Sequence, residues 1–92
     1  MQQLAMKTID VIKKELFEYV KENTFKDTST LINDTKLFVE GIFDSMGFVM
    51  LLEFLEDTYG VTASDGELVE ENFESIDSIV DFIVTKNPAT IQ

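Results

Sequence analysis

The segment Ser45–Tyr59 is more apolar than any other part of this 92-residue chain, and it limits the folds that the chain can adopt. A β-strand of this length is unusual, so the segment predicts an α-helix that ends at Gly60. Four of its side chains can face the protein core together: Leu51, Leu52, Leu55 and Tyr59. Apolar side chains nearer the helix start are left partly outside the core, which indicates contact with something else.

Two further segments have the apolar periodicity of amphipathic helices. One runs from Leu4 to about Glu22, where the apolar residues Ile9, Ile12, Leu16 and Val20 recur with Phe17 beside them. The other follows Ser75, a good N-cap, and ends at Lys86 before Pro88, with one apolar face formed by Ile76, Ile79, Val80 and Ile83. A short helical piece, capped by Ser64 or Asp65, is expected through Leu68 and Val69. The chain is therefore predicted to be all-α, a four-helix bundle with a long first loop and a short third helix.

The first loop, residues Asn23–Phe43, lacks a sustained period. We expect it to be held to the core by Phe25, Leu31, Ile32, Leu37, Phe38 and Ile42. Other side chains assigned to the core are Leu16, Leu52, Phe54, Leu55, Phe73, Ile79, Phe82 and Ile83. We expect one domain over residues 1–92, with its core in 4–86 and a polar tail at 87–92.

The absence of cysteine and histidine removes disulfides, thiolate metal sites, cysteine nucleophiles and the commonest general base. The acids do not have the spacing of a calcium-binding loop, so no metal site is predicted. Ser45 has neither a histidine partner nor a Gly-x-Ser-x-Gly turn, and a bundle this small offers no evident cleft for paired carboxylates. We therefore expect a protein that is not an enzyme.

The formal net charge is −11, and residues 37–85 hold twelve acidic side chains and no basic one. Such a surface disfavours nucleic acids and anionic membranes and favours a basic partner protein. A solvated face that keeps the protein soluble is the simpler explanation. No secretory leader is visible and no apolar run approaches the roughly 20 residues that a bilayer requires, so we expect a cytoplasmic monomer without stable membrane association.

The motif Gly41-Ile42-Phe43-Asp44-Ser45-Met46-Gly47 directly precedes and opens the apolar helix. A serine at a helix start can be explained by capping alone, because its hydroxyl accepts hydrogen bonds from free backbone amides. Here the serine is also flanked by glycines and aromatic residues, and it ends a long loop. The setting indicates that Ser45 is presented at the surface.

At these residues the chain resembles the carrier-protein family, the four-helix acyl and peptidyl carriers that bear 4′-phosphopantetheine on a serine. Asp44-Ser45-Met46 is similar to the Asp-Ser-Leu motif of that family, with methionine in place of leucine. The pattern Leu51-Leu52-x-x-Leu55-Glu56-x-x-Tyr59-Gly60-Val61 resembles the second helix and its exit. The sequence Glu71-Asn72-Phe73-Glu74-Ser75-Ile76 resembles the short third helix leading into the fourth. The resemblance covers roughly residues Ile9 to Val84.

The resemblance implies that a phosphopantetheinyl transferase, using coenzyme A and Mg²⁺, attaches the arm to Ser45, with Asp44 near the metal. The arm would carry an acyl or aminoacyl group as a thioester, in lipid or secondary metabolite biosynthesis. Loading and transferring enzymes with basic docking patches would then bind the exposed side of the second helix. The side chains expected to contact them are Met46, Phe48, Met50, Glu53, Glu56 and Asp57. For the apolar ones among these, a place in the core is equally expected.

The subclass can be read from departures within the motif. Fatty-acid-synthase carriers usually have acids two and five residues after the modified serine, where this chain has Gly47 and Met50. Peptidyl carriers usually have a Gly-Gly-x-Ser motif, which is absent. The pattern is closer to the stand-alone D-alanyl carrier proteins. The alternative from another class is an acidic helical adaptor or inhibitor that binds a basic partner without covalent modification.

Overall fold

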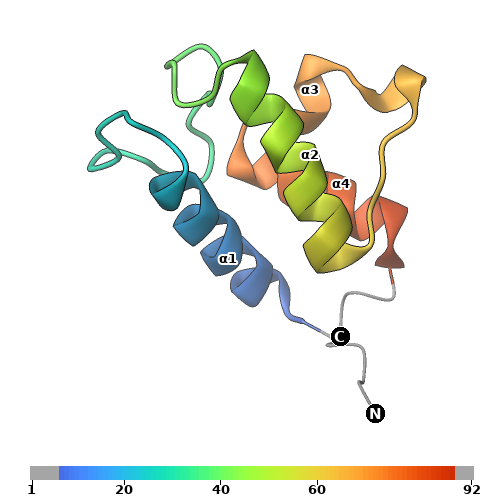
Figure 1. Cartoon of the computed structure of the whole chain (residues 1–92). Helices are drawn as coiled ribbons and strands as arrows, with labels where there is room; N and C mark the ends of the chain where they lie inside the picture. The colour runs from blue at the N-terminus through green and yellow to red at the C-terminus, as the bar shows by residue number, and fades with distance from the viewer. Residues whose placement is uncertain (1–6, 89–92) are drawn as a thin grey trace.

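The computed structural model describes residues 7–88 and shows four α-helices in that range (Figure 1). They are α1 (Ile9–Glu22), α2 (Ser45–Tyr59), α3 (Glu70–Phe73) and α4 (Ile76–Lys86), and a single 3-10 turn, η1 (Asp65–Glu67), precedes α3. The prediction of an all-α bundle with a long first loop and a short third helix is confirmed. The predicted positions in residues 1–6 and 89–92 lie outside the described residues.

The helix boundaries follow from local capping. Helix α1 begins at Ile9, because the Thr8 side chain accepts a hydrogen bond from the amide of Val11 and so forms the N-cap. The predicted helix is therefore wrong at Lys7 and Thr8, and its predicted start at Leu4 lies outside the described residues. The predicted bounds of α2 are confirmed. That helix ends at Gly60, whose φ of 67° lies in the left-handed region that glycine adopts without strain. Ser75 caps α4 as predicted, by accepting from the amide of Ser78.

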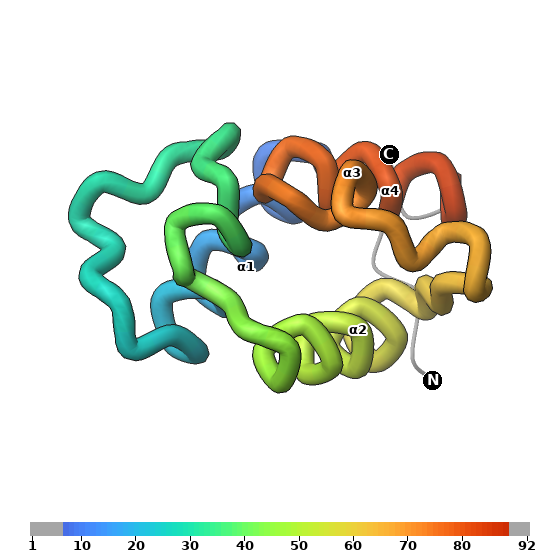
Figure 2. Tube along the Cα trace, turned by 90° about the horizontal axis from the view of Figure 1, so that it is seen from above, coloured from blue at the N-terminus to red at the C-terminus, as the bar shows by residue number. Residues whose placement is uncertain are grey.

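The core lies between α2 on one side and α1, α3 and α4 on the other (Figures 1 and 2). Helix α4 packs closely against α3 and α1, whereas large aromatic rings connect α2 to its neighbours. Tyr19 stacks on Phe54 with ring centroids 4.2 Å apart, and Phe48 meets Phe73 edge-on at 5.2 Å. The fully buried side chains include Ile12, Leu16, Val20, Leu37, Leu51, Phe73, Ile76, Ile79 and Ile83.

The long connection between α1 and α2 lies at one end of the molecule (Figure 2). Its backbone is tied to the opposite side of the bundle, because the amide of Leu37 donates to the carbonyl of Glu74 at 2.7 Å and the amide of Asp77 donates to the carbonyl of Asn33 at 3.0 Å. Four of its predicted anchors are confirmed as buried or half-buried: Leu31, Leu37, Phe38 and Ile42. The first loop is thus a packed part of the fold.

Two predicted anchors of that loop are wrong. Phe25 is fully exposed and Ile32 is 59% exposed. Local hydrogen bonds fix the backbone at both places: the Thr24 hydroxyl donates to the carbonyl of Ile42, and the amide of Ile32 donates to the Thr35 hydroxyl oxygen. These bonds hold the backbone in turns that direct the adjacent apolar side chains outward.

The short helical piece after Gly60 also differs from the prediction. Ser64 caps η1 as expected, and Glu67 reaches back to the Ser64 amide to complete a capping box. The piece does not continue through Leu68 and Val69, which are exposed and connect η1 to α3. Glu67 also binds Lys86 at 2.8 Å, and this bond holds the pKa of Glu67 below its usual value.

One polar network is packed against the core at the exit of α2. The Tyr59 hydroxyl donates to Glu15 at 2.7 Å, and the Lys7 ammonium binds the same carboxylate at 3.0 Å. Burial, with the hydrogen bond to Glu15 as a smaller contribution, raises the pKa of Tyr59 far above its ordinary value. The network therefore favours the neutral phenol of Tyr59.

We predict that this network makes the protein sensitive to alkaline pH. Because the pKa of Tyr59 is higher in the folded than in the unfolded protein, its stabilisation is fully present below about pH 10 and is lost above it. Urea unfolding between pH 7 and pH 11 should show a shallower alkaline loss of stability in Tyr59→Phe than in wild type. Equal slopes for the two proteins would contradict this.

Candidate functional site

The start of α2 is capped by Asp44. Its side-chain Oδ1 accepts a hydrogen bond from the amide of Gly47 at 2.8 Å, and its carbonyl accepts from the amide of Phe48 at 2.9 Å. Ser45 is the first helical residue and is exposed. The suggestion that the Ser45 hydroxyl itself caps the helix is therefore wrong, because the carboxylate one residue earlier already binds the amide that a capping group would take.

Hydrogen-bonding capacity remains free around Ser45. Within residues 7–88, its hydroxyl has no hydrogen-bond partner, and the amides of Ser45 and Met46 have no acceptor. These amides begin a helix of fifteen residues, where unpaired N–H groups and the helix dipole together favour an anion. The start of α2 can therefore accommodate an anion beside Ser45.

Gly47 relieves crowding at the first turn of α2. A Cβ atom at that position would lie 3.2 Å from a ring carbon of Phe43 and 3.4 Å from the Asp44 Oδ1. Phe43 is buried beneath the helix start, so its ring has little room to move aside. The glycine of the motif thus lets the buried ring and the capping carboxylate both lie close to the first turn of α2.

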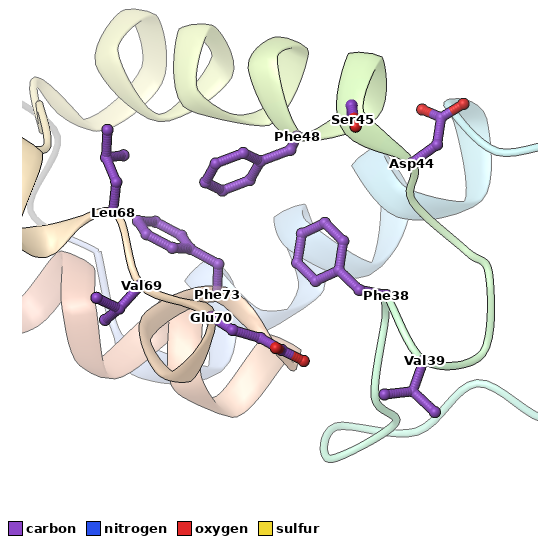
Figure 3. Close-up of a pocket in the computed structure, with 9 residues that line it drawn as sticks. All are labelled: Phe38, Val39, Asp44, Ser45, Phe48, Leu68, Val69, Glu70 and Phe73. Carbon is purple, nitrogen blue, oxygen red and sulfur yellow. The ribbon is translucent and has the colours of Figure 1, made fainter.

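A pocket of about 530 Å³ adjoins Ser45 between α2, α3 and the first loop. Figure 3 shows Phe38, Phe48 and Phe73 pointing toward one another at its centre. Val39, Leu68 and Val69 complete its apolar walls, while Asp44, Ser45 and Glu70 supply polar groups. The volume lies in the range of small-molecule sites. Phe48, predicted to contact partners, is half-buried in this pocket.

The other predicted contact residues form an exposed face of α2. Met46 is 66% exposed and Met50 is 43% exposed. Glu53 and Asp57 follow at helical spacing on the same face, with Glu56 beside them, and all three are exposed. The charge of Glu53 adds to burial in raising the pKa of Tyr19, which places this carboxylate near α1. Along α2 from Ser45, this face begins with apolar side chains and continues with acidic ones.

The acids of this face have no ion-pair partner in the described part of the chain. The four ion pairs found there join Lys7 to Glu15, Lys13 to Asp77, Lys36 to Glu74 and Lys86 to Glu67. Four of the seven lysines thus pair with acids on α1, η1 and the α3–α4 side. Within residues 7–88, no lysine pairs with Asp44, Glu53, Glu56 or Asp57. The negative field along α2 is open to a basic partner.

Four residues that line the pocket were not predicted from the sequence. Val39 comes from the long loop, Leu68 and Val69 come from the segment that enters α3, and Glu70 is the first residue of that helix. Neither segment has an apolar period that would indicate its orientation, and their approach to Ser45 depends on the folded path of both connections. The aromatic residues of the first loop were the only sequence signal of an apolar site there.

We predict opposite outcomes for the two residues of the motif. Asp44→Ala should lose about 0.5–2 kcal/mol of unfolding free energy, because it removes the cap of α2. Ser45→Ala should remain within about 0.5 kcal/mol of wild type, because its hydroxyl binds nothing in residues 7–88. Urea unfolding followed by circular dichroism measures both. A larger loss in Ser45→Ala than in Asp44→Ala would show that the serine is the cap.

No helix in the described part of the chain is long and apolar enough to span a membrane.

No family model matches the sequence. Three curated proteins are similar, all D-alanyl carrier proteins of streptococci. The protein of Streptococcus sanguinis is 31% identical over 70 residues, which are 76% of this chain and 87% of the relative. That of Streptococcus mutans is 31% identical over 72 residues, or 78% of this chain and 90% of the relative. That of Streptococcus suis is 29% identical over 73 residues, which are 79% of this chain and 91% of the relative.

Proposed function

Because this chain belongs to the carrier-protein family, on the side of the D-alanyl carrier proteins, we propose that it carries an acyl or aminoacyl group on 4′-phosphopantetheine attached to Ser45. Membership of this family confirms the prediction that the chain is a carrier and not an enzyme. The observation that carries the proposal is the exposed hydroxyl of Ser45 at the first position of a helix that Asp44 already caps.

The attachment uses the free groups at the helix start. The Ser45 hydroxyl oxygen bonds to the phosphorus of coenzyme A that bears the pantetheine, and the bond from that phosphorus to the adenosine bisphosphate breaks. The hydroxyl proton leaves to a base of the transferase. The amides of Ser45 and Met46 can then donate to the phosphate oxygens, which stabilises the anion at the helix N-terminus. Asp44 lies beside these atoms and can bind the Mg²⁺ that accompanies coenzyme A.

The residues of the pocket fit the rest of the arm. When attached, the arm supplies a terminal thiol, which holds the cargo as a thioester and gives a chain without cysteine its reactive sulfur. The rings of Phe38 and Phe48, with the exposed side chains of Val39 and Leu68, offer an apolar surface in the pocket that Ser45 also lines. The names of the streptococcal relatives favour an aminoacyl cargo. Glu70, at the edge of the pocket, suits the ammonium group that such a cargo carries.

Partner enzymes are proposed to dock on the exposed face of α2. The unpaired acids Glu53, Glu56 and Asp57 attract basic patches and raise the association rate, while Met46 and Met50 supply apolar contact. Enzymes that load and remove the cargo can share this surface, since the arm reaches into the active site of each. The proposed location of the protein is the cytoplasm, where coenzyme A is present.

The proposal predicts that incubation with coenzyme A, Mg²⁺ and a promiscuous phosphopantetheinyl transferase adds one phosphopantetheinyl group to the wild-type protein. Ser45→Ala should gain nothing while keeping its helical circular dichroism. Ser64→Ala is the matched control, because Ser64 is also an exposed serine at the start of a helical segment. It should gain the group as wild type does. Intact-mass spectrometry reads all three results.

The adaptor hypothesis predicts a different pattern. A folded wild-type protein that gains no group under these conditions would contradict the carrier proposal and favour an adaptor that binds a basic partner. Gain in Ser45→Ala equal to that in wild type would place the modification on another side chain. Either result overturns the assignment of Ser45.

A further inference from the structure

A second hollow, of about 330 Å³, lies on the other side of the start of α2. Three exposed apolar side chains line it, Phe25, Met46 and Met50, and the buried residues Ile42 and Phe43 belong to its lining. Met46 and Met50 lie one helical turn apart, on a different face of α2 from Ser45 and Phe48. Ser45 is thus flanked by the apolar pocket on one face of α2 and by this hollow on another.

The backbone beside Phe25 is held by its neighbour Thr24. The Thr24 hydroxyl donates to the carbonyl of Ile42 at 2.8 Å and accepts from the amide of Lys26 at 3.1 Å. The backbone on both sides of Phe25 is therefore fastened to the segment that leads into α2. An apolar ring held in the open beside two exposed methionines forms a surface typical of protein contacts.

The charges around the hollow favour a basic occupant. The face of α2 that begins with Met46 and Met50 continues with Glu53 and Asp57, whose carboxylates have no ion-pair partner in residues 7–88. Lys26 and Asp44 also line the hollow and offset each other in formal charge. A second copy of this chain would bring another net charge of −11 to the contact, which disfavours a dimer.

Proximity to Ser45 selects among basic partners. The hollow is lined by Asp44, Met46 and Gly47, the residues on either side of Ser45 in the chain. An enzyme that acts on the terminal thiol of the arm can keep its active site as far from Ser45 as the arm is long. An enzyme that modifies the hydroxyl must bring its active site to bonding distance of Ser45, so it must cover the adjacent residues.

We propose that this hollow receives an apolar side chain of the phosphopantetheinyl transferase, while basic side chains of that enzyme lie over Glu53 and Asp57. The inference rests on the proposed function and names Phe25, a residue of the first loop, as part of the docking surface. Phe25 acts by binding the enzyme, so it should affect binding of the carrier and leave the chemical step unchanged.

The test is the steady-state rate of modification with coenzyme A, Mg²⁺ and a promiscuous phosphopantetheinyl transferase as the probe. Phe25→Ala should lower kcat/KM about tenfold through KM, as truncation of an aromatic anchor does, with kcat within about twofold of wild type. Met50→Ala should also raise KM. The double variant should lose less than the product of the two single losses, because both side chains line one hollow.

Val11→Ala is the matched control. Val11 is an exposed apolar residue in the first turn of α1, at the end of that helix remote from Ser45 (Figure 1), and its variant should keep the wild-type kcat/KM. Phe25→Ala should keep the wild-type urea midpoint, since its ring is fully exposed. A wild-type kcat/KM in Phe25→Ala would overturn the inference.

Two other results separate the possible failures. A wild-type protein that sediments as a dimer and becomes a monomer in Phe25→Ala would assign the hollow to a second copy of the chain and overturn the inference. Absence of any modification in wild type would contradict the proposed function itself. Normal modification of both wild type and Phe25→Ala would contradict only the docking role of the hollow.

Discussion

The hydrogen bond from the Gly47 amide to the Asp44 carboxylate, 2.8 Å long, is the contact on which the site depends. It begins α2 at Ser45 and leaves the serine hydroxyl without a hydrogen-bond partner in residues 7–88. A glycine at position 47 eases this packing, because a Cβ atom there would lie 3.2 Å from the Phe43 ring, which is a tight contact. The Asp-Ser pair of the motif therefore divides two roles that one residue could not fill together. The aspartate holds the helix, and the serine is open to modification.

Helix α2 then separates two surfaces around this serine. One face turns Phe48 toward Phe73 and Phe38, which produces an apolar pocket large enough for part of an arm or its cargo. Another face turns Met46 and Met50 outward toward Phe25, with acids further along the helix. A carrier needs both properties, because its cargo must be held near the protein while different enzymes recognise the protein surface. The helical period of α2 places these two sets of side chains on different faces of one segment.

Much of this architecture could be predicted from the sequence, because it depends on local rules. The bounds of α2, the cap at Ser75 and the apolar face of α4 follow from helical periodicity and capping chemistry. Phe25 and Ile32 could not be placed in the same way. Their orientation depends on Thr24 and Thr35, whose hydroxyl groups bind backbone atoms that only the folded loop brings near. Val69 and Val39 reach the pocket for a similar reason, since the two irregular connections that hold them meet beside Ser45.

In the proposed carrier, a phosphate on Ser45 lies at the free amides that begin α2. Two-dimensional proton–nitrogen NMR spectra of the protein before and after phosphopantetheinylation test this placement. We expect the largest shifts to fall on the amides of Ser45 and Met46, while core amides such as that of Ile79 keep their positions. Largest shifts at another serine, such as Ser64 or Ser75, or changes spread through the whole core, would contradict it.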